Sequence, residues 1–144
     1  MINLTEVKKS DIDGFGVFAT EDIRKDAIIE ECPVIREYLD PEAKVLLSYK
    51  FVGRRTTKTK IEFYIVPTGN ALLYNSSEDR NVKVHRTSVI GDIEYDYKNR
   101  ILRLIATRDI KKGEELFLDY KTSEQKAQDK LDEAIEFWES KITA

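Results

Sequence analysis

The sequence predicts a mainly β domain that is followed by one amphipathic helix. Short apolar runs separated by turn residues recur over the first 120 residues, and residues 92–97 alternate strictly between acidic and apolar side chains, which is the period of a half-buried strand. The pattern changes after residue 121. A capping box at 122–125 precedes apolar residues at helical spacing, namely Ala127, Leu131, Ala134, Ile135, Trp138 and Ile142. We therefore expect a domain at residues 1–121 and a helical extension at 122–144 that packs on it.

The strands are expected at residues 2–8, 16–20, 27–32, 62–66, 82–86, 92–97 and 101–106. Asp40-Pro41 interrupts them, because an N-cap residue followed by proline is typical of the start of a helix. The basic stretch at 54–60 has no apolar face and is expected to be an exposed loop or a hairpin tip. Residues 19–26 recur in a related form at 106–113, which indicates that a strand end and its turn are used twice.

The composition favours one globular domain, with 41% hydrophobic and 35% charged residues. The net charge of −3 gives no basic field of the kind that attracts nucleic acid, so we expect no nucleic-acid partner. One cysteine, Cys32, and one histidine, His85, cannot build a tetrahedral zinc site or an internal disulfide. The absence of an apolar signal or membrane segment predicts a cytoplasmic protein without a membrane partner.

Three motifs carry the functional prediction. Gly14-Phe15-Gly16 allows a tight turn and a close approach of the backbone to a ligand, although most such pairs only form turns. Asn75 and Asn81 lie in a polar loop, and an asparagine amide offers both a donor and an acceptor for fixing a ligand. The third motif, residues 106–120, ends in Glu-Leu-Phe-Leu-Asp-Tyr at Tyr120. Taken alone, a tyrosine at the end of a strand is more often a packing residue.

Together and in this order, the three motifs resemble the SET domain, the β-rich fold of most protein lysine methyltransferases. The resemblance spans about residues 3–120 and is to minimal stand-alone members of the bacterial and viral kind. It implies several short sheets, with the last segment tucked beneath the asparagine loop in a near-knot. Ser76 stands where the family usually has histidine, and Arg80 stands where it usually has proline.

The resemblance implies methyl transfer from S-adenosylmethionine to a lysine side chain of a protein or peptide, with S-adenosylhomocysteine as the product and no metal. It places Tyr120 at the throat of the lysine channel, as the catalytic residue that orients transfer. It also implies that Asn75 holds the amino-acid end of the cofactor. The other expected cofactor-binding residues are Gly14, Phe15, Gly16, Tyr74, Ser76 and Trp138.

Some of these roles have alternatives. Phe15 and Tyr74 are equally well explained as core aromatics, and Trp138 either covers the adenine or the channel or packs in the core. Ser76 and Arg80 raise a second function, that of a SET-fold module with weak or no catalysis that binds peptide or protein partners. The sequence leaves open the substrate protein, the number of methyl groups added, the effect of Ser76 on cofactor binding, and whether the chain forms a homodimer.

Overall fold

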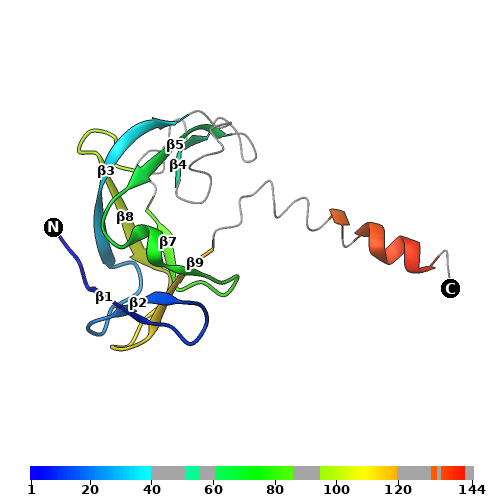
Figure 1. Cartoon of the computed structure of the whole chain (residues 1–144), viewed down its shortest axis with the longest axis horizontal. Helices are drawn as coiled ribbons and strands as arrows, with labels where there is room; N and C mark the ends of the chain where they lie inside the picture. Colours follow the sequence, from blue (N-terminus) through cyan, green and yellow to red (C-terminus); the bar gives the residue numbers. More distant parts are fainter. Residues whose placement is uncertain (40–50, 56–60, 86–94, 120–130, 133, 142–144) are drawn as a thin grey trace.

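The structure, a computed structural model of the 144-residue chain, describes residues 1–39, 51–55, 61–85, 95–119, 131–132 and 134–141. It confirms the mainly β class (Figure 1). The strands are β1 Thr5–Lys9, β2 Phe15–Ala19, β3 Ile28–Leu39, β4 Phe51–Arg55, β5 Ile61–Pro67, β6 Asn75–Ser76, β7 Val82–Val84, β8 Ile101–Ala106 and β9 Glu115–Leu118. A short 3-10 helix, η2, covers Ala71–Leu73, and an α-helix covers residues 134–141 near the C-terminus.

The smaller sheet brings the two ends of the domain together. Its order is β1-β2-β9-β6, so the last strand lies between the N-terminal hairpin and the strand that carries Asn75. β9 runs antiparallel to β2 and parallel to β6, with Asn75 opposite Phe117 and Ser76 opposite Leu118. The final segment is thus seated against the asparagine loop, as the sequence predicts.

The larger sheet has the order β4-β5-β3-β8-β7, and β3 is its central strand. Residues 28–33 of β3 pair with β8, whereas residues 34–39 pair with β5. Pro33 lies at the change of partner, where its missing N–H removes no ladder bond that the sheet needs. The sequence predicts a strand that ends with the apolar run at residue 32, but β3 continues to Leu39.

The two related turns, 19–26 and 106–113, pair with each other. Ile23 and Ile110 exchange both backbone hydrogen bonds, at 2.8 and 2.7 Å. The carboxylate of Asp22 accepts the N–H of Lys112 at 2.9 Å, and that of Asp109 accepts the N–H of Lys25 at 2.8 Å. Each aspartate therefore caps the turn of the other copy. The repeat in the sequence thus corresponds to two turns that bind each other, which we call the reciprocal junction. It holds the chain in place just before β9 begins.

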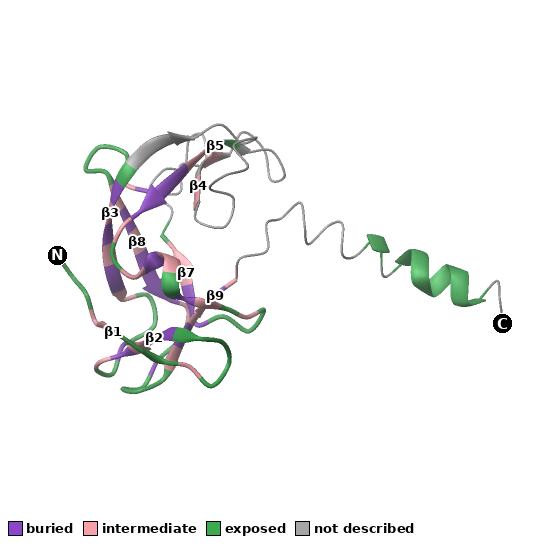
Figure 2. Cartoon of the chain, viewed as in Figure 1, coloured by how far each residue is buried: buried purple, intermediate pink, exposed green. Residues whose placement is uncertain are grey.

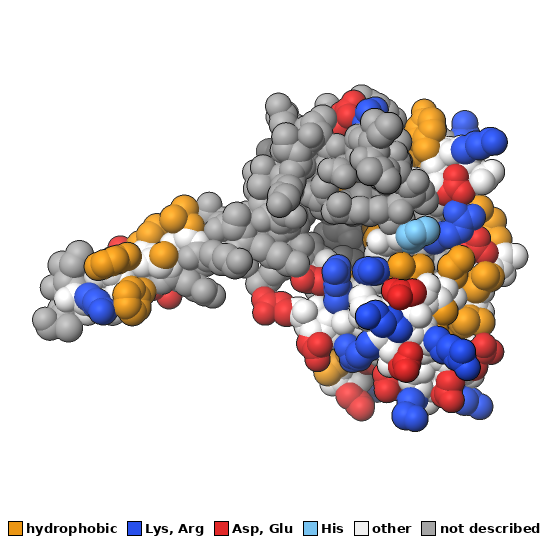
Figure 3. Space-filling view, turned by 180° about the vertical axis from the view of Figure 1, so that it is seen from behind, with side chains coloured by type: hydrophobic (Ala, Val, Ile, Leu, Met, Phe, Trp, Pro, Cys, Tyr) orange, Lys and Arg blue, Asp and Glu red, His pale blue; other side chains and the backbone are white. Residues whose placement is uncertain are grey.

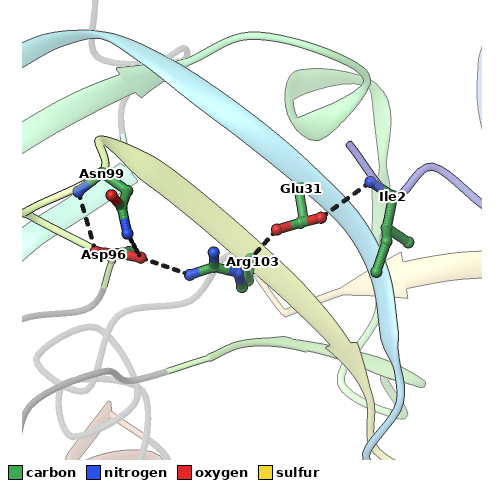
Figure 4. Close-up of polar contacts among 5 residues, drawn as sticks. All are labelled: Ile2, Glu31, Asp96, Asn99 and Arg103. Carbon is green, nitrogen blue, oxygen red and sulfur yellow. Dashed lines mark hydrogen bonds and ion pairs between the residues drawn. The ribbon is translucent and has the colours of Figure 1, made fainter.

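A chain of polar contacts crosses the larger sheet (Figure 4). Arg103 donates to Glu31 at 3.0 Å and to Asp96 at 2.8 Å. Asn99 donates to the carboxylate of Asp96 through its backbone and side chain, and the N–H of Ile2 donates to Glu31. The bonds from Arg103 and then Asn99 lower the pKa of Asp96 to about 2. The bond from Ile2, followed by Arg103, lowers the pKa of Glu31.

Another strand expectation, that for residues 92–97, is wrong within the described residues. Of the alternating segment 92–97, residues 95–97 form a bend, a bridge from Asp96 to Ile101 and the start of a turn. Tyr95 is fully buried whereas Tyr97 is 55% exposed, although their rings meet edge to face, so the segment does not present the uniformly buried face that the alternation predicts. The cause is the pair of bonds from Asn99 to Asp96, which closes the turn early. Residues 92–94 and the helix expected after Asp40 lie outside the described residues.

The buried residues lie on strands of both sheets (Figure 2) and form one core cluster. It contains the apolar faces of β2, β3, β5, β8 and β9, with Val17, Ile29, Ile65, Leu102 and Leu116 completely buried. In contrast, every helical residue described after position 130 for which burial is given is exposed, including Leu131, Ile135 and Trp138. The packing of this helix on the domain stays a prediction.

Candidate functional site

The glycine motif forms one wall of a polar cluster. Gly14 has φ +44°, which glycine adopts without the strain that a side chain would cause, and its carbonyl accepts the N–H of Ser10 at 2.8 Å. Gly16 is required for a different reason. A Cβ at Gly16 would lie 2.5 Å from Oε2 of Glu115 and 3.2 Å from Nδ2 of Asn75. The bare backbone of Gly16 therefore allows Glu115 and Asn75 to meet.

The side-chain amide of Asn75 is surrounded by acceptors. Its Nδ2 donates to Oε2 of Glu115 at 2.8 Å and to Oγ of Ser10 at 3.1 Å, and the carbonyls of Asp13 and Phe15 lie at 3.2 and 3.5 Å. The hydroxyl of Ser10 in turn donates to Oε1 of Glu115 at 2.7 Å. We call this group the Asn75 cluster: Ser10, the carbonyls of Asp13 and Phe15, Asn75 and Glu115.

The acceptors fix which way the amide faces. A carboxylate and two carbonyls only accept hydrogen bonds, so the nitrogen of Asn75 must point to them and its Oδ1 must point away. Within the described residues, Oδ1 of Asn75 accepts no hydrogen bond. The cluster therefore presents one oriented acceptor, backed by the carboxylate of Glu115. This arrangement suits a ligand that donates hydrogen bonds and carries positive charge.

A second asparagine holds the strand that supplies Glu115. Asn81 is 1% exposed, its Nδ2 donates to the carbonyl of Glu115 at 2.9 Å, and its Oδ1 accepts the N–H of Phe117 at 2.7 Å. The N–H of Ser77 also donates to the carbonyl of Leu118 at 2.9 Å. These bonds set the register of β9 against the loop, which places the Glu115 side chain at Asn75.

The structure brings together only part of the predicted site. Gly14, Phe15, Gly16 and Asn75 meet as described, and Phe15 is 67% exposed beside them. Ser76 has an exposed side chain and pairs through its backbone with Leu118. The predicted catalytic residue, Tyr120, lies outside the described residues, two positions beyond the end of β9.

Two predicted cofactor residues lie apart from the Asn75 cluster. Tyr74 is 2% exposed and its hydroxyl donates to Oε1 of Glu30 at 2.9 Å, which matches its alternative role as a core aromatic. Trp138 lies on the C-terminal helix, is 63% exposed and contacts the ring of Phe137 edge to face.

Sequence reasoning did not single out Ser10 or Glu30. Ser10 reaches Glu115 across 105 positions of sequence, and no local pattern reports a contact at that separation. Glu30 did leave a signal, because it is an acidic residue inside the apolar run 27–32 and is 1% exposed in the structure. Of the chain's one cysteine and one histidine, Cys32 is buried and His85 is exposed.

The family model of the SET domain matches residues 14–121. The chain belongs to the SET-domain family. The matched span begins at the glycine motif and ends one residue after Tyr120, so it contains all three motifs that the sequence indicates. No curated protein matches the chain.

Solved structures of SET histone methyltransferases are similar to this SET domain. A proposed histone methyltransferase of Plasmodium falciparum is 24% identical with a TM-score of 0.59, over 84% of this chain and 96% of that one. Polycomb repressive complex 2 of Chaetomium thermophilum, in an autoinhibited conformation bound to S-adenosylmethionine, is 25% identical with a TM-score of 0.58. That match covers 93% of this chain but only 17% of the polycomb chain.

The charges on the face of the domain seen in Figure 3 do not indicate a binding site for a charged ligand. Acidic and basic side chains are intermingled over the face of the domain in Figure 3, so this face has no patch of a single charge. In the part of the chain that the structure describes, no helix is long and apolar enough to cross a membrane. The same residues include no group of three or more histidine, cysteine or acidic side chains placed to hold a metal.

Proposed function

We propose that this SET domain is an S-adenosylmethionine-dependent methyltransferase that acts on a lysine side chain of a protein or peptide. The observation that carries the proposal is the Asn75 cluster, in which Oδ1 is an oriented acceptor, next to the Gly14–Gly16 turn, that takes no hydrogen bond from the described residues. Membership of the SET family supports it. So does the similar polycomb structure, which is bound to S-adenosylmethionine.

The residues of the cluster fit the amino-acid end of this cofactor. An ammonium group would donate to Oδ1 of Asn75, on the side of the amide that faces away from the Asp13 and Phe15 carbonyls, and the negative charge of the Glu115 carboxylate behind the amide favours a positively charged ligand. Gly16 keeps the wall of the site free of a side chain. When bound, S-adenosylmethionine would supply an electrophilic methyl group on a sulfonium centre.

Tyr120 is the proposed catalytic residue. It follows β9 by two positions, and the register of β9 is fixed by Asn81 and by pairing with β6. Its hydroxyl would orient the lysine amine for in-line attack, and such positioning can remove several kcal/mol of an activation barrier. Phe15, which is exposed beside the cluster, and Trp138 are proposed to line the cofactor or lysine path.

Calorimetric titration of the purified chain with S-adenosylmethionine tests the proposal, followed by incubation of labelled cofactor with a panel of basic proteins. We expect saturable binding at one site per chain and label on lysine of at least one protein. Binding without transfer to any protein, or no binding at all, would favour the alternative raised by Ser76 and Arg80, a SET-fold module that binds protein partners. Sedimentation of the same sample decides between monomer and homodimer.

A further inference from the structure

A buried carboxylate lies behind the segment that carries Asn75. Glu30 projects from the central strand β3 and is 1% exposed, as deeply buried as the apolar core around it. None of the ion pairs in the described part of the chain includes Glu30. Burying a carboxylate without a cationic partner lowers the stability of the fold. The hydrogen bonds that Glu30 makes therefore indicate which part of the structure it holds in place.

The contacts of Glu30 go to both ends of one short segment. Oε2 accepts the N–H of Asn70 at 2.8 Å, and Oε1 accepts the hydroxyl of Tyr74 at 2.9 Å. Asn70 is the residue before η2 and Tyr74 is the residue after it. Glu30 therefore holds the start and the end of the 3-10 turn that leads directly into Asn75.

The packing around the carboxylate is close. Gly69 has φ +69°, and a Cβ there would lie 2.5 Å from Oε2 of Glu30 and 3.4 Å from Sγ of Cys32. Burial, followed by the charge of Glu30, raises the pKa of the Cys32 thiol, so this neighbour stays a neutral donor. Among the described residues, the groups at the carboxylate are thus neutral donors and the bare backbone of Gly69, which together hold the segment 69–74 against β3.

We infer that Glu30 is a positioning residue: it fixes the 69–74 segment on β3 and thereby holds the amide of Asn75 in the orientation that binds the cofactor. Tyr74 is the link, because it is bonded to Glu30 and is adjacent to Asn75 in the chain. A buried polar network with every member satisfied favours one arrangement over its alternatives. This inference rests on the proposed function of Asn75, but the orientation of the amide can be measured without any cofactor.

The test compares Glu30→Gln and Tyr74→Phe with Ile65→Val, a conservative core variant in β5 of the same sheet that leaves the polar bonds of Glu30 in place. Glutamine retains the shape of Glu30 but cannot accept at both ends, and phenylalanine removes the hydroxyl that donates to Glu30. We expect each site variant to raise the dissociation constant of S-adenosylmethionine about tenfold, with kcat at saturating cofactor changed less than about twofold. Ile65→Val should lower the unfolding free energy but leave the dissociation constant of S-adenosylmethionine unchanged.

A second readout separates the two proposals. The side-chain NH₂ resonances of Asn75, assigned with Asn75→Ala, should shift in Glu30→Gln and Tyr74→Phe but not in Ile65→Val. Unchanged resonances and unchanged affinity in a folded Tyr74→Phe would overturn the inference, even if Glu30→Gln fails to fold. If the wild-type chain binds no cofactor, the proposed function fails, and the Asn75 resonances alone decide whether Glu30 positions the amide.

Discussion

Replacing Gly16 with alanine isolates the one steric requirement on which the Asn75 cluster depends. The new methyl group would lie 2.5 Å from Oε2 and 3.0 Å from Cδ of Glu115, and 3.2 Å from Nδ2 of Asn75. None of these atoms can yield easily, because Glu115 is bonded to Ser10 and Asn75, and its backbone is bonded to Asn81. Relief requires breaking the bond between Glu115 and Asn75.

The size of the effect follows from these contacts. Overpacking at a site of this kind costs about 1–3 kcal/mol of unfolding free energy. Freeing the amide of Asn75 to rotate also removes the oriented acceptor, so we expect the affinity for S-adenosylmethionine to fall at least about tenfold, which corresponds to one lost charge-assisted hydrogen bond. Urea denaturation measures the first quantity and calorimetric titration measures the second.

Gly113→Ala is the matched control. Gly113 has φ +90° and no atom within 4 Å of an added Cβ, so alanine there meets backbone strain but no neighbour. Its unfolding free energy should fall by about 1–2 kcal/mol, whereas its affinity for the cofactor should equal that of the wild type. The reasoning is refuted if Gly16→Ala binds S-adenosylmethionine as tightly as Gly113→Ala does, because the cluster would then be irrelevant to the cofactor.

Three further predictions address other parts of the molecule. Tyr120→Phe should lower kcat about 100-fold or more while cofactor affinity changes little, and full turnover by this variant would remove Tyr120 from the mechanism. Asp22→Ala and Asp109→Ala should each lower the unfolding free energy by about 1 kcal/mol in urea, since each removes one cap of the reciprocal junction, and two neutral variants would contradict its role. The lowered pKa of Asp96, about 2 against an ordinary 3.8, predicts a contribution of about 1–2 kcal/mol that is complete above pH 4 and is lost as pH falls toward 2, because the unfolded chain takes up the proton first. Melting temperatures of the wild type and Asp96→Asn should therefore converge over that interval, and a constant difference would show that Arg103 does not hold the carboxylate.

The sequence predicted those elements whose bounds are set by residues that are neighbours in the chain. β8 occupies the predicted residues 101–106, because its apolar run begins after a turn and ends at a polar one. The repeated turn at 19–26 and 106–113 was visible in the sequence, although its reciprocal pairing was not. The alternation at 92–97 failed where Asn99 closes a turn onto Asp96, since a side-chain cap can override a strand pattern.

The contacts that form the site join residues that are far apart in the sequence, so patterns among neighbouring residues do not reveal them. The motifs indicated Asn75 and the glycines, but the partner that orients Asn75 is a carboxylate 40 positions away, and a hydroxyl that links them comes from the first hairpin. Only the fold determines that these groups meet. Glu30 was similarly concealed, because an acidic residue in an apolar run signals burial without naming the groups that satisfy it.

The position of β9 makes the site and the fold interdependent. Glu115, which orients Asn75, belongs to the strand that is seated between β2 and β6 and is held there by Asn81. Until β9 is in place, the amide of Asn75 lacks its strongest acceptor and Oδ1 has no fixed direction. A ligand that binds this acceptor therefore binds only the chain in which β9 has been seated, and it stabilises that whole arrangement by mass action. Glu30 holds the segment 69–74 rather than β9. The amide of Asn75 is therefore fixed where two separately anchored segments meet.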